Sequence, residues 1–217
     1  MAAALRVDVW SDVICPWCYI GKRRLEAALR QTGYADRVDV RWHSFQLDPG
    51  HPAGKRQPVH DMLAGKYGVP PAQVRAMTRQ VSELAAAEGL TYALDRAIAV
   101  NTLDAHRLNQ LAAGHGLGGQ LHERLLRAHL VDGEVLDDAP TLIRLAAEVG
   151  LDVDAVRRVL DGDGYAADVA ADARAAHRLG ATGVPFFVID DRWRISGAQP
   201  VDAFVAALRA AHAAAGA

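Results

Sequence analysis

Alternating apolar and polar residues predict the first strand of the fold, and a change of period predicts the helix that follows it. Residues 5–10 alternate in this way, which is typical of a strand with one buried face. Apolar residues then recur at helical spacing until Gly33, and residues 38–43 form a second predicted strand. This succession favours a βαβ unit whose two strands are parallel.

The middle of the chain has a different character. A linker rich in proline and glycine occupies residues 51–58, and from about residue 58 to residue 179 we find helical spacing and no convincing strand. The apolar faces there, such as the one carrying Met77 and Val81, are typical of helices that pack on one another. We therefore assign no chemistry to them.

Strands return near the end of the chain. Residues 186–189 and 192–195 flank the turn Asp190-Asp191, so the pair is predicted to form a hairpin. A last amphipathic helix is expected from residue 201 onward.

The two β-containing ends are each too small to be stable alone. We therefore expect an α/β fold in which they join into one four-stranded mixed sheet. Residues 1–50 and 179–217 would form one discontinuous domain, and residues 51–178 a large all-helical insertion.

Composition narrows the class of protein. Of the 217 residues, 51% are hydrophobic and 23% charged, as in an ordinary globular protein, and the net charge of −2 offers no case for a nucleic-acid partner. No apolar run approaches the roughly 18–20 residues that span a bilayer, so no membrane partner is expected. The first six residues show no secretory pattern, and only two cysteines occur, so we expect a cytoplasmic location.

Those two cysteines form Cys15-Pro16-Trp17-Cys18, between the first predicted strand and the first predicted helix. Proline suits the first helical position, and Cys15 at the cap would meet free backbone N–H groups and the positive end of the helix dipole. Both favour a thiolate, so Cys15 is the expected nucleophile. Cys18, one turn deeper, is the expected resolving thiol, because residues three apart share a helix face.

Other interpretations of this motif stay open on the residues alone. A zinc site needs four ligands, and neither a second cysteine pair nor a paired histidine spacing that would complete one is present. Two incidental buried thiols are also common in proteins. A further informative stretch is Gly183-Val184-Pro185, which suits either a cis bond in a tight turn or an ordinary trans proline at the start of a strand.

Several motifs together resemble the DsbA family of thioredoxin-fold oxidoreductases, and more specifically its FrnE-like cytoplasmic branch. The resemblance spans nearly the whole chain. It is carried by DVICPWCYIGK at residues 12–22, Asn101-Thr102 followed by AHRL at residues 105–108, GVPFF at residues 183–187 and SGAQ at residues 196–199.

The resemblance implies a thioredoxin fold with a helical insertion and a cis Val184–Pro185 bond that faces Cys15. In this family the backbone of that loop receives an extended substrate beside the nucleophile, which adds Val184 and Pro185 to the expected substrate-binding residues. Many relatives carry histidine in place of Trp17, so a strongly oxidising character is not implied here.

The further candidate substrate-binding residues come from position. Pro16 and Trp17 lie between the cysteines, His106 lies at the edge of the apolar face that starts at residue 103, and Gln199 precedes the last helix. His106 also suits a satisfied boundary residue, and Gln199 an ordinary turn.

The sequence therefore predicts a dithiol–disulfide oxidoreductase or isomerase that acts on protein or small-molecule disulfides. No metal and no tightly bound cofactor are expected. Glutathione is a candidate co-substrate, and glutathione or a thioredoxin system would reset the cysteine pair.

Two alternative functions belong to other classes of protein. The first is a glutathione-dependent isomerase or transferase of the hydroxychromene-carboxylate isomerase or kappa type, in which the nucleophile position is usually serine; the presence of Cys18 argues against it. The second is a non-enzymatic module that binds metal or uses the helical insertion as a chaperone-like surface.

Overall fold

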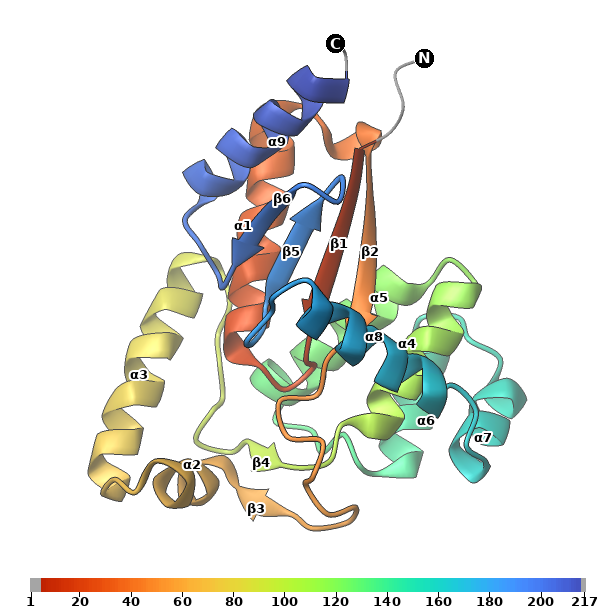
Figure 1. Ribbon diagram of the computed structural model, residues 1–217. Coiled ribbons are helices and arrows are strands. Elements are labelled where there is room, and N and C mark those ends of the chain that lie inside the picture. The colour runs from red at the N-terminus through yellow and green to blue at the C-terminus, as the bar shows by residue number, and fades with distance from the viewer. Residues whose placement is uncertain (1–4, 216–217) are drawn as a thin grey trace.

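The computed structural model describes residues 5–215 and contains a four-stranded mixed sheet (Figure 1). The strand order is β2-β1-β5-β6. β1 runs parallel to β2 and antiparallel to β5, and β5 and β6 form an antiparallel hairpin. The predicted βαβ unit, closing hairpin and joined sheet are confirmed. The strands are β1 (Leu5–Ser11), β2 (Val38–Ser44), β5 (Phe186–Ile189) and β6 (Trp193–Ser196).

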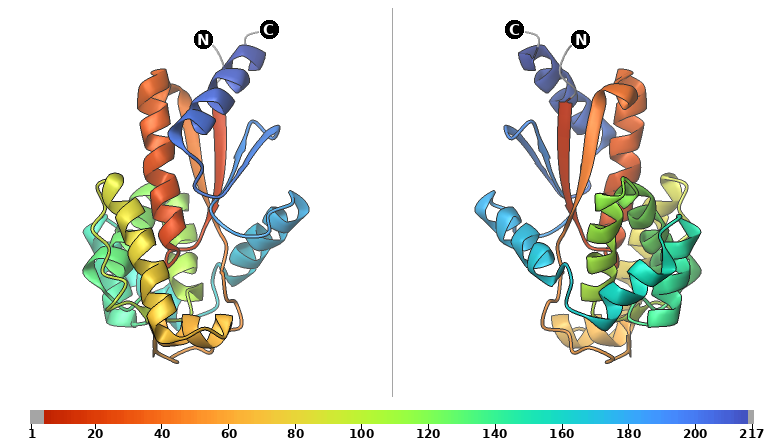
Figure 2. Two further views of the ribbon diagram at one scale, coloured as in Figure 1. Left: turned by 90° about the vertical axis from the view of Figure 1, so that its left-hand side faces the viewer. Right: turned by 90° about the vertical axis from the view of Figure 1, so that its right-hand side faces the viewer.

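Helices α1 (Pro16–Thr32) and α9 (Val201–Ala215) cover one face of this sheet, as Figure 2 shows edge-on. Alternate residues of β1 point into the core between the sheet and these helices, where Val7 and Val9 are fully buried beside Phe187 of β5. The alternation seen in the sequence therefore has a physical cause, since successive side chains of a strand point to opposite faces.

Helix α8 (Ala166–Arg178) packs on the opposite face (Figure 2). Trp10 of β1 donates its indole N–H to the carbonyl of Asp172 at 2.9 Å, and the Asp172 carboxylate accepts from His43 Nδ1 at 3.0 Å. His43 Nε2 also lies 2.8 Å from the Asp8 carboxylate. The hydrogen bonds of Trp10 in β1 and His43 in β2 to Asp172 thus attach α8 to the sheet.

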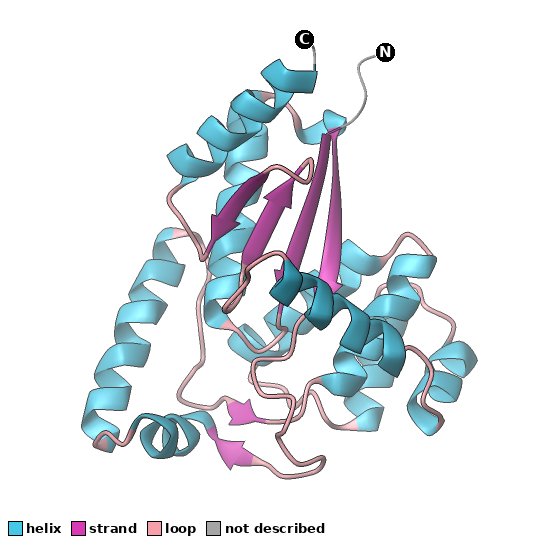
Figure 3. Ribbon diagram, in the orientation of Figure 1, coloured by secondary structure: helices cyan, strands magenta, loops and turns pink. Residues whose placement is uncertain are grey.

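The segment between β2 and β5 is the predicted helical insertion, which contributes most of the helices in Figure 3. Side-chain caps begin two of its helices: Asp138 accepts the N–H of Thr141 at 3.0 Å, and Asp152 accepts the N–H of Ala155 at 2.8 Å. Its helices are α2 (Val59–Tyr67), α3 (Pro71–Ala87), α4 (Leu103–Gly114), α5 (Gly118–Arg127), a π-helical turn (Ala128–Asp132), α6 (Ala139–Glu148), α7 (Val153–Asp161) and α8.

The insertion also contains a small element that the sequence pattern did not reveal. β3 (Gln57–Pro58) and β4 (Ile98–Ala99) pair antiparallel as a two-stranded ladder. Two residues per strand are too few to produce a visible alternation, which is why helical spacing alone was found there. The domain limits at residues 50 and 178 stay a prediction.

No helix within residues 5–215 combines the length and the apolar character needed to cross a bilayer.

Candidate active site

The cysteine motif lies at the junction of β1 and α1, as the sequence predicts. Pro16 is the first residue of the helix, and Cys15 is its N-cap with extended backbone angles. A turn brings the chain there, in which the N–H of Cys15 donates to the carbonyl of Asp12 at 3.1 Å. The Cys15 side chain therefore lies beside the first N–H groups of α1, which lack intrahelical acceptors.

The two thiols are close together and differ in their surroundings. The Cys15 and Cys18 side chains are 3.4 Å apart, both as free thiols, with exposures of 4% and 1%. Burial raises the pKa of the Cys18 thiol well above its ordinary value, and the neighbouring Cys15 adds to this rise. The Ser11 hydroxyl works in the opposite direction and lowers the pKa of Cys18. Cys18 is therefore protonated until a reaction at Cys15 changes its surroundings.

A cis peptide bond joins Val184 to Pro185, as the resemblance implies. The Val184 carbonyl oxygen lies 3.7 Å from Cys15 Sγ, so this loop lies opposite the Cys15 thiol. Gly21 of α1 permits the approach, because a Cβ there would lie 2.9 Å from Pro185 Cγ. The loop continues into β5, where the Pro185 carbonyl accepts the N–H of Gly197 at 2.8 Å.

Buried polar side chains lie next to the cysteine motif and hydrogen-bond one another. The Asp12 carboxylate, fully buried, lies 3.2 Å from His106 Nε2 and accepts the N–H of Leu47 at 2.8 Å. Ser11 Oγ lies 3.0 Å from His122 Nε2. Burial, together with the nearby His106 and Lys22, lowers the pKa of His122 to about 3, so this imidazole is neutral near neutral pH.

A cavity of about 330 Å³ opens beside Cys15. The predicted site residues Pro16, Trp17 and Val184 line it, with Trp17 39% exposed. His129 lines it as well, from the π-helical turn. Burial lowers the pKa of His129 to about 4, only partly offset by the negative charge of Asp12, so this imidazole too is neutral.

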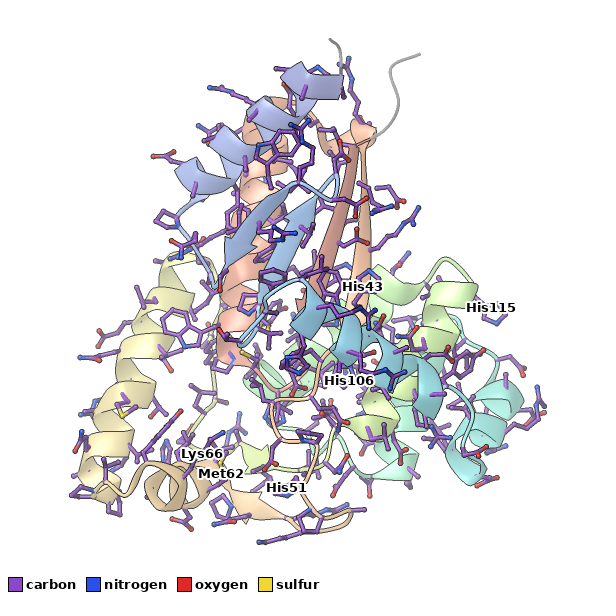
Figure 4. All side chains as sticks on the ribbon, in the orientation of Figure 1. His43, His51, Met62, Lys66, His106 and His115 are labelled. Atoms are coloured by element: carbon purple, nitrogen blue, oxygen red, sulfur yellow. The ribbon has the colours of Figure 1, made fainter. Side chains whose placement is uncertain are left out.

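Two other predicted site residues lie elsewhere. His106, 1% exposed, is held by Asp12 below the end of the sheet and does not line the cavity (Figure 4). Gln199 donates to the Ser196 carbonyl at 2.9 Å in the turn before α9 and is also outside the cavity. Their contact with substrate stays a prediction.

The structure adds residues that sequence reasoning missed. Tyr92 donates its hydroxyl to the Pro16 carbonyl at 2.6 Å, which fixes the start of α1. Met77 and Val81, interpreted from the sequence as core, line the cavity. His129 carries no local sequence signal, because its position depends on how α5 and the following turn pack against α1. For Met77 the sole signal was its membership of an apolar helix face, which indicates burial and not a site.

Metal ligands do not gather in the described part of the chain. Within residues 5–215 no group of three or more His, Cys, Asp or Glu side chains is arranged to hold a metal ion.

Comparisons with known proteins agree with this geometry. The family model for the DSBA-like thioredoxin domain matches residues 6–209. The crystal structure of a probable DsbA oxidoreductase from Streptomyces coelicolor is similar, with 43% identity, a TM-score of 0.93, and coverage of 96% of this chain and 90% of that one.

Two further relatives are more distant. The uncharacterised protein YwbO of Bacillus subtilis is 27% identical, over 94% of this chain and 96% of its own length. The cytosolic disulfide reductase DsbM of Pseudomonas aeruginosa, solved with glutathione, is 25% identical with a TM-score of 0.60, over 94% of this chain and 98% of that one.

The match covers the cysteine motif, the insertion and the cis-proline loop in a single stretch of sequence. This chain belongs to the DSBA-like thioredoxin domain family and is a DsbA-like thiol–disulfide oxidoreductase.

Proposed function

We propose that the Cys-Pro-Trp-Cys pair carries out the exchange, with Cys15 as nucleophile and Cys18 as resolving thiol. The observation that carries this assignment is the asymmetry of the pair. Cys15 caps α1, faces the Val184 carbonyl and lines the cavity, whereas Cys18 is buried one turn deeper with a raised pKa. A substrate disulfide can therefore reach Cys15 first.

The exchange proceeds in two balanced steps. The Cys15 thiolate attacks one sulfur of the substrate disulfide, which forms a mixed disulfide and releases the other sulfur as a thiol after it takes up a proton. Cys18 then gives up its proton and attacks Cys15 Sγ, which forms the Cys15–Cys18 disulfide; the departing sulfur takes up a proton and leaves as the second substrate thiol. The protein loses two electrons to the substrate, and the same steps in reverse oxidise a dithiol.

The loop at Val184 and Pro185 is proposed to hold the substrate chain beside Cys15. Its support is the carbonyl that already lies 3.7 Å from the sulfur. Glutathione is proposed as the co-substrate that resets the pair, and the cytoplasm as the location. Both proposals are supported by the similarity to a cytosolic disulfide reductase solved with glutathione.

Substitution of the two cysteines tests the assignment. Cys15→Ser should abolish the reduction of insulin disulfides, because the remaining thiol, Cys18, is buried and has a raised pKa. Cys18→Ala should still react once and then hold a long-lived mixed disulfide with glutathione, visible as a mass increase in intact-protein mass spectrometry. Insulin reduction by the Cys15→Ser protein at the wild-type rate would refute the assignment.

A further inference from the structure

The cavity beside Cys15 is built from the insertion as well as from the thioredoxin fold. It lies between the start of α1 and the two insert helices α2 and α3. Its walls are mainly apolar, and the side chains that form them include Trp17, Met62, Leu63, Met77 and Val81.

Exposed apolar side chains are concentrated at this cavity. Among the described residues, five large hydrophobic side chains are substantially exposed, and four of them line the cavity, namely Trp17, Leu47, Tyr67 and Met77. The fifth, Leu84, lies on α3 outside it. Because an exposed apolar cluster marks a binding surface, this distribution points to an apolar ligand next to the reactive thiol.

The cavity has few polar side chains, and they differ in whether they have a partner within the protein. The Asp48 carboxylate lies 3.7 Å from His51 Nδ1, and Lys66 forms no ion pair within the described residues. Figure 4 shows Lys66 and Met62 on the side of α2 that faces the rest of the molecule. His129, 2% exposed, carries a buried Nδ1 with no hydrogen-bond partner. Within the described residues, the cavity thus presents one cation without an ion-pair partner, Lys66, to a ligand.

Size restricts what the ligand can be. Pockets for small molecules occupy roughly 300–1,000 Å³, so a cavity of about 330 Å³ accepts one arm of a small molecule. We propose that the substrates of this enzyme include low-molecular-weight disulfides with an apolar, acid-terminated arm, which lies in the cavity with its acidic group toward Lys66.

This inference rests on the proposed function, because the bound arm is one half of the disulfide that Cys15 attacks. Attack at the sulfur of that arm transfers it to Cys15 and releases the other arm as a thiol. Attack by Cys18 then releases the bound arm as the second thiol. Two protein thiols become one disulfide and one substrate disulfide becomes two thiols, so no further reactant is needed for a single turnover.

A matched series of disulfides tests the apolar arm. The fully reduced protein is mixed with dithiodipropionate or dithiodihexanoate, and its oxidation is followed by stopped-flow tryptophan fluorescence. Each rate constant is divided by the rate constant of dithiothreitol with the same disulfide, to remove intrinsic reactivity. Each methylene buried should raise the normalised rate constant about fourfold, so the longer acid should react about tenfold faster or more. Equal normalised rates would overturn the inference.

Variants on α3 locate the effect in the cavity. Met77→Ser should reduce severalfold the ratio of the normalised rate constant with dithiodihexanoate to that with dithiodipropionate. Leu84→Ser removes an equally exposed side chain from the same helix, outside the cavity, and should change neither rate. The same loss in both variants would place the preference elsewhere and overturn the inference.

The charge is tested with an amine of the same length. The wild type should prefer dithiodihexanoate over bis(aminohexyl) disulfide, and Lys66→Glu should reverse this preference. Lys55→Glu makes the same charge change outside the cavity and should preserve it. An unchanged preference in Lys66→Glu would show that Lys66 does not bind the acidic group and would overturn the proposed charge preference.

Failure of the proposed function has a different signature. If Cys15 is not the nucleophile, Cys15→Ser and the wild type react alike with every disulfide. If only the inference fails, Cys15→Ser is inert and the wild type reacts without preference for the longer, acidic arm.

Discussion

The ion pair at His43 gives a prediction whose sign and size follow from the structure. Burial alone would lower the pKa of this imidazole, but hydrogen bonds to Asp172 and Asp8 outweigh burial and raise the pKa from 6.5 to about 9. The contact joins α8 to the sheet, since Asp172 belongs to α8 and Asp8 to β1. The protonated imidazole therefore stabilises the folded state more than the unfolded state.

The raised pKa sets the pH range of this stabilisation. It is complete below pH 6.5, where the imidazole is protonated in both states, and it is lost as the pH rises through 9. A rise of this size corresponds to at most about 3 kcal/mol. The His43 side chain is 26% exposed. Solvent screening reduces the contribution, and we expect about 2 kcal/mol.

Urea unfolding of His43→Gln and wild type between about pH 6 and pH 10 measures the effect. The variant should be about 2 kcal/mol less stable near pH 6, and the difference should shrink toward pH 10. Some difference should remain, because His43 also stacks on Trp10 with ring centroids 4.6 Å apart. His115, an exposed histidine on the far side of the insertion (Figure 4), provides the control His115→Gln, which should follow the wild type. A constant difference across the range would refute the reasoning.

Two further predictions concern the frame of the active site. Gly21→Ala places a methyl group 2.9 Å from Pro185 Cγ. Its free energy of unfolding in urea should therefore be about 1–3 kcal/mol lower than that of Gly114→Ala, whose added Cβ meets nothing within 4 Å. Equal stabilities of the two variants would contradict this close packing. Ser11→Ala removes a hydroxyl that lowers the pKa of the Cys18 thiol. It should therefore lengthen the lifetime of the mixed disulfide about tenfold in acid-quench mass spectrometry, whereas an unchanged lifetime would exclude this role.

The pattern of residues within a segment predicted its structure correctly wherever that structure depends on the segment alone. The alternation in β1 and the proline at the first position of α1 predicted a strand, a helix start and the position of both cysteines, and the structure confirms them. Resemblance, rather than pattern, supplied the cis bond before Pro185. From the residues alone an ordinary trans bond was favoured, because proline lowers the cost of a cis bond but trans remains the commoner isomer.

The candidate site was harder to predict where it depends on contacts between distant segments. His106 was a candidate substrate-binding residue at the edge of a helix face, and it lies buried beside Asp12, 94 positions away in sequence. The helical spacing of Met77 predicts a core residue, but its side chain is 38% exposed and lines the cavity. In both cases helical spacing identifies the face that a side chain shares, but not the neighbour that this face meets.

The amino-acid sequence by itself determined the chemistry of this protein: one pair of thiols three residues apart, at a place where strand pattern gives way to helix pattern. Those properties are local, since they depend on spacing within a single turn of helix. Only the tertiary structure decided what surrounds the pair. It placed the Val184 carbonyl opposite Cys15, buried Cys18, and brought α2 and α3 of the insertion around an apolar cavity. These contacts join segments far apart in the chain, so the packing of the whole fold sets them.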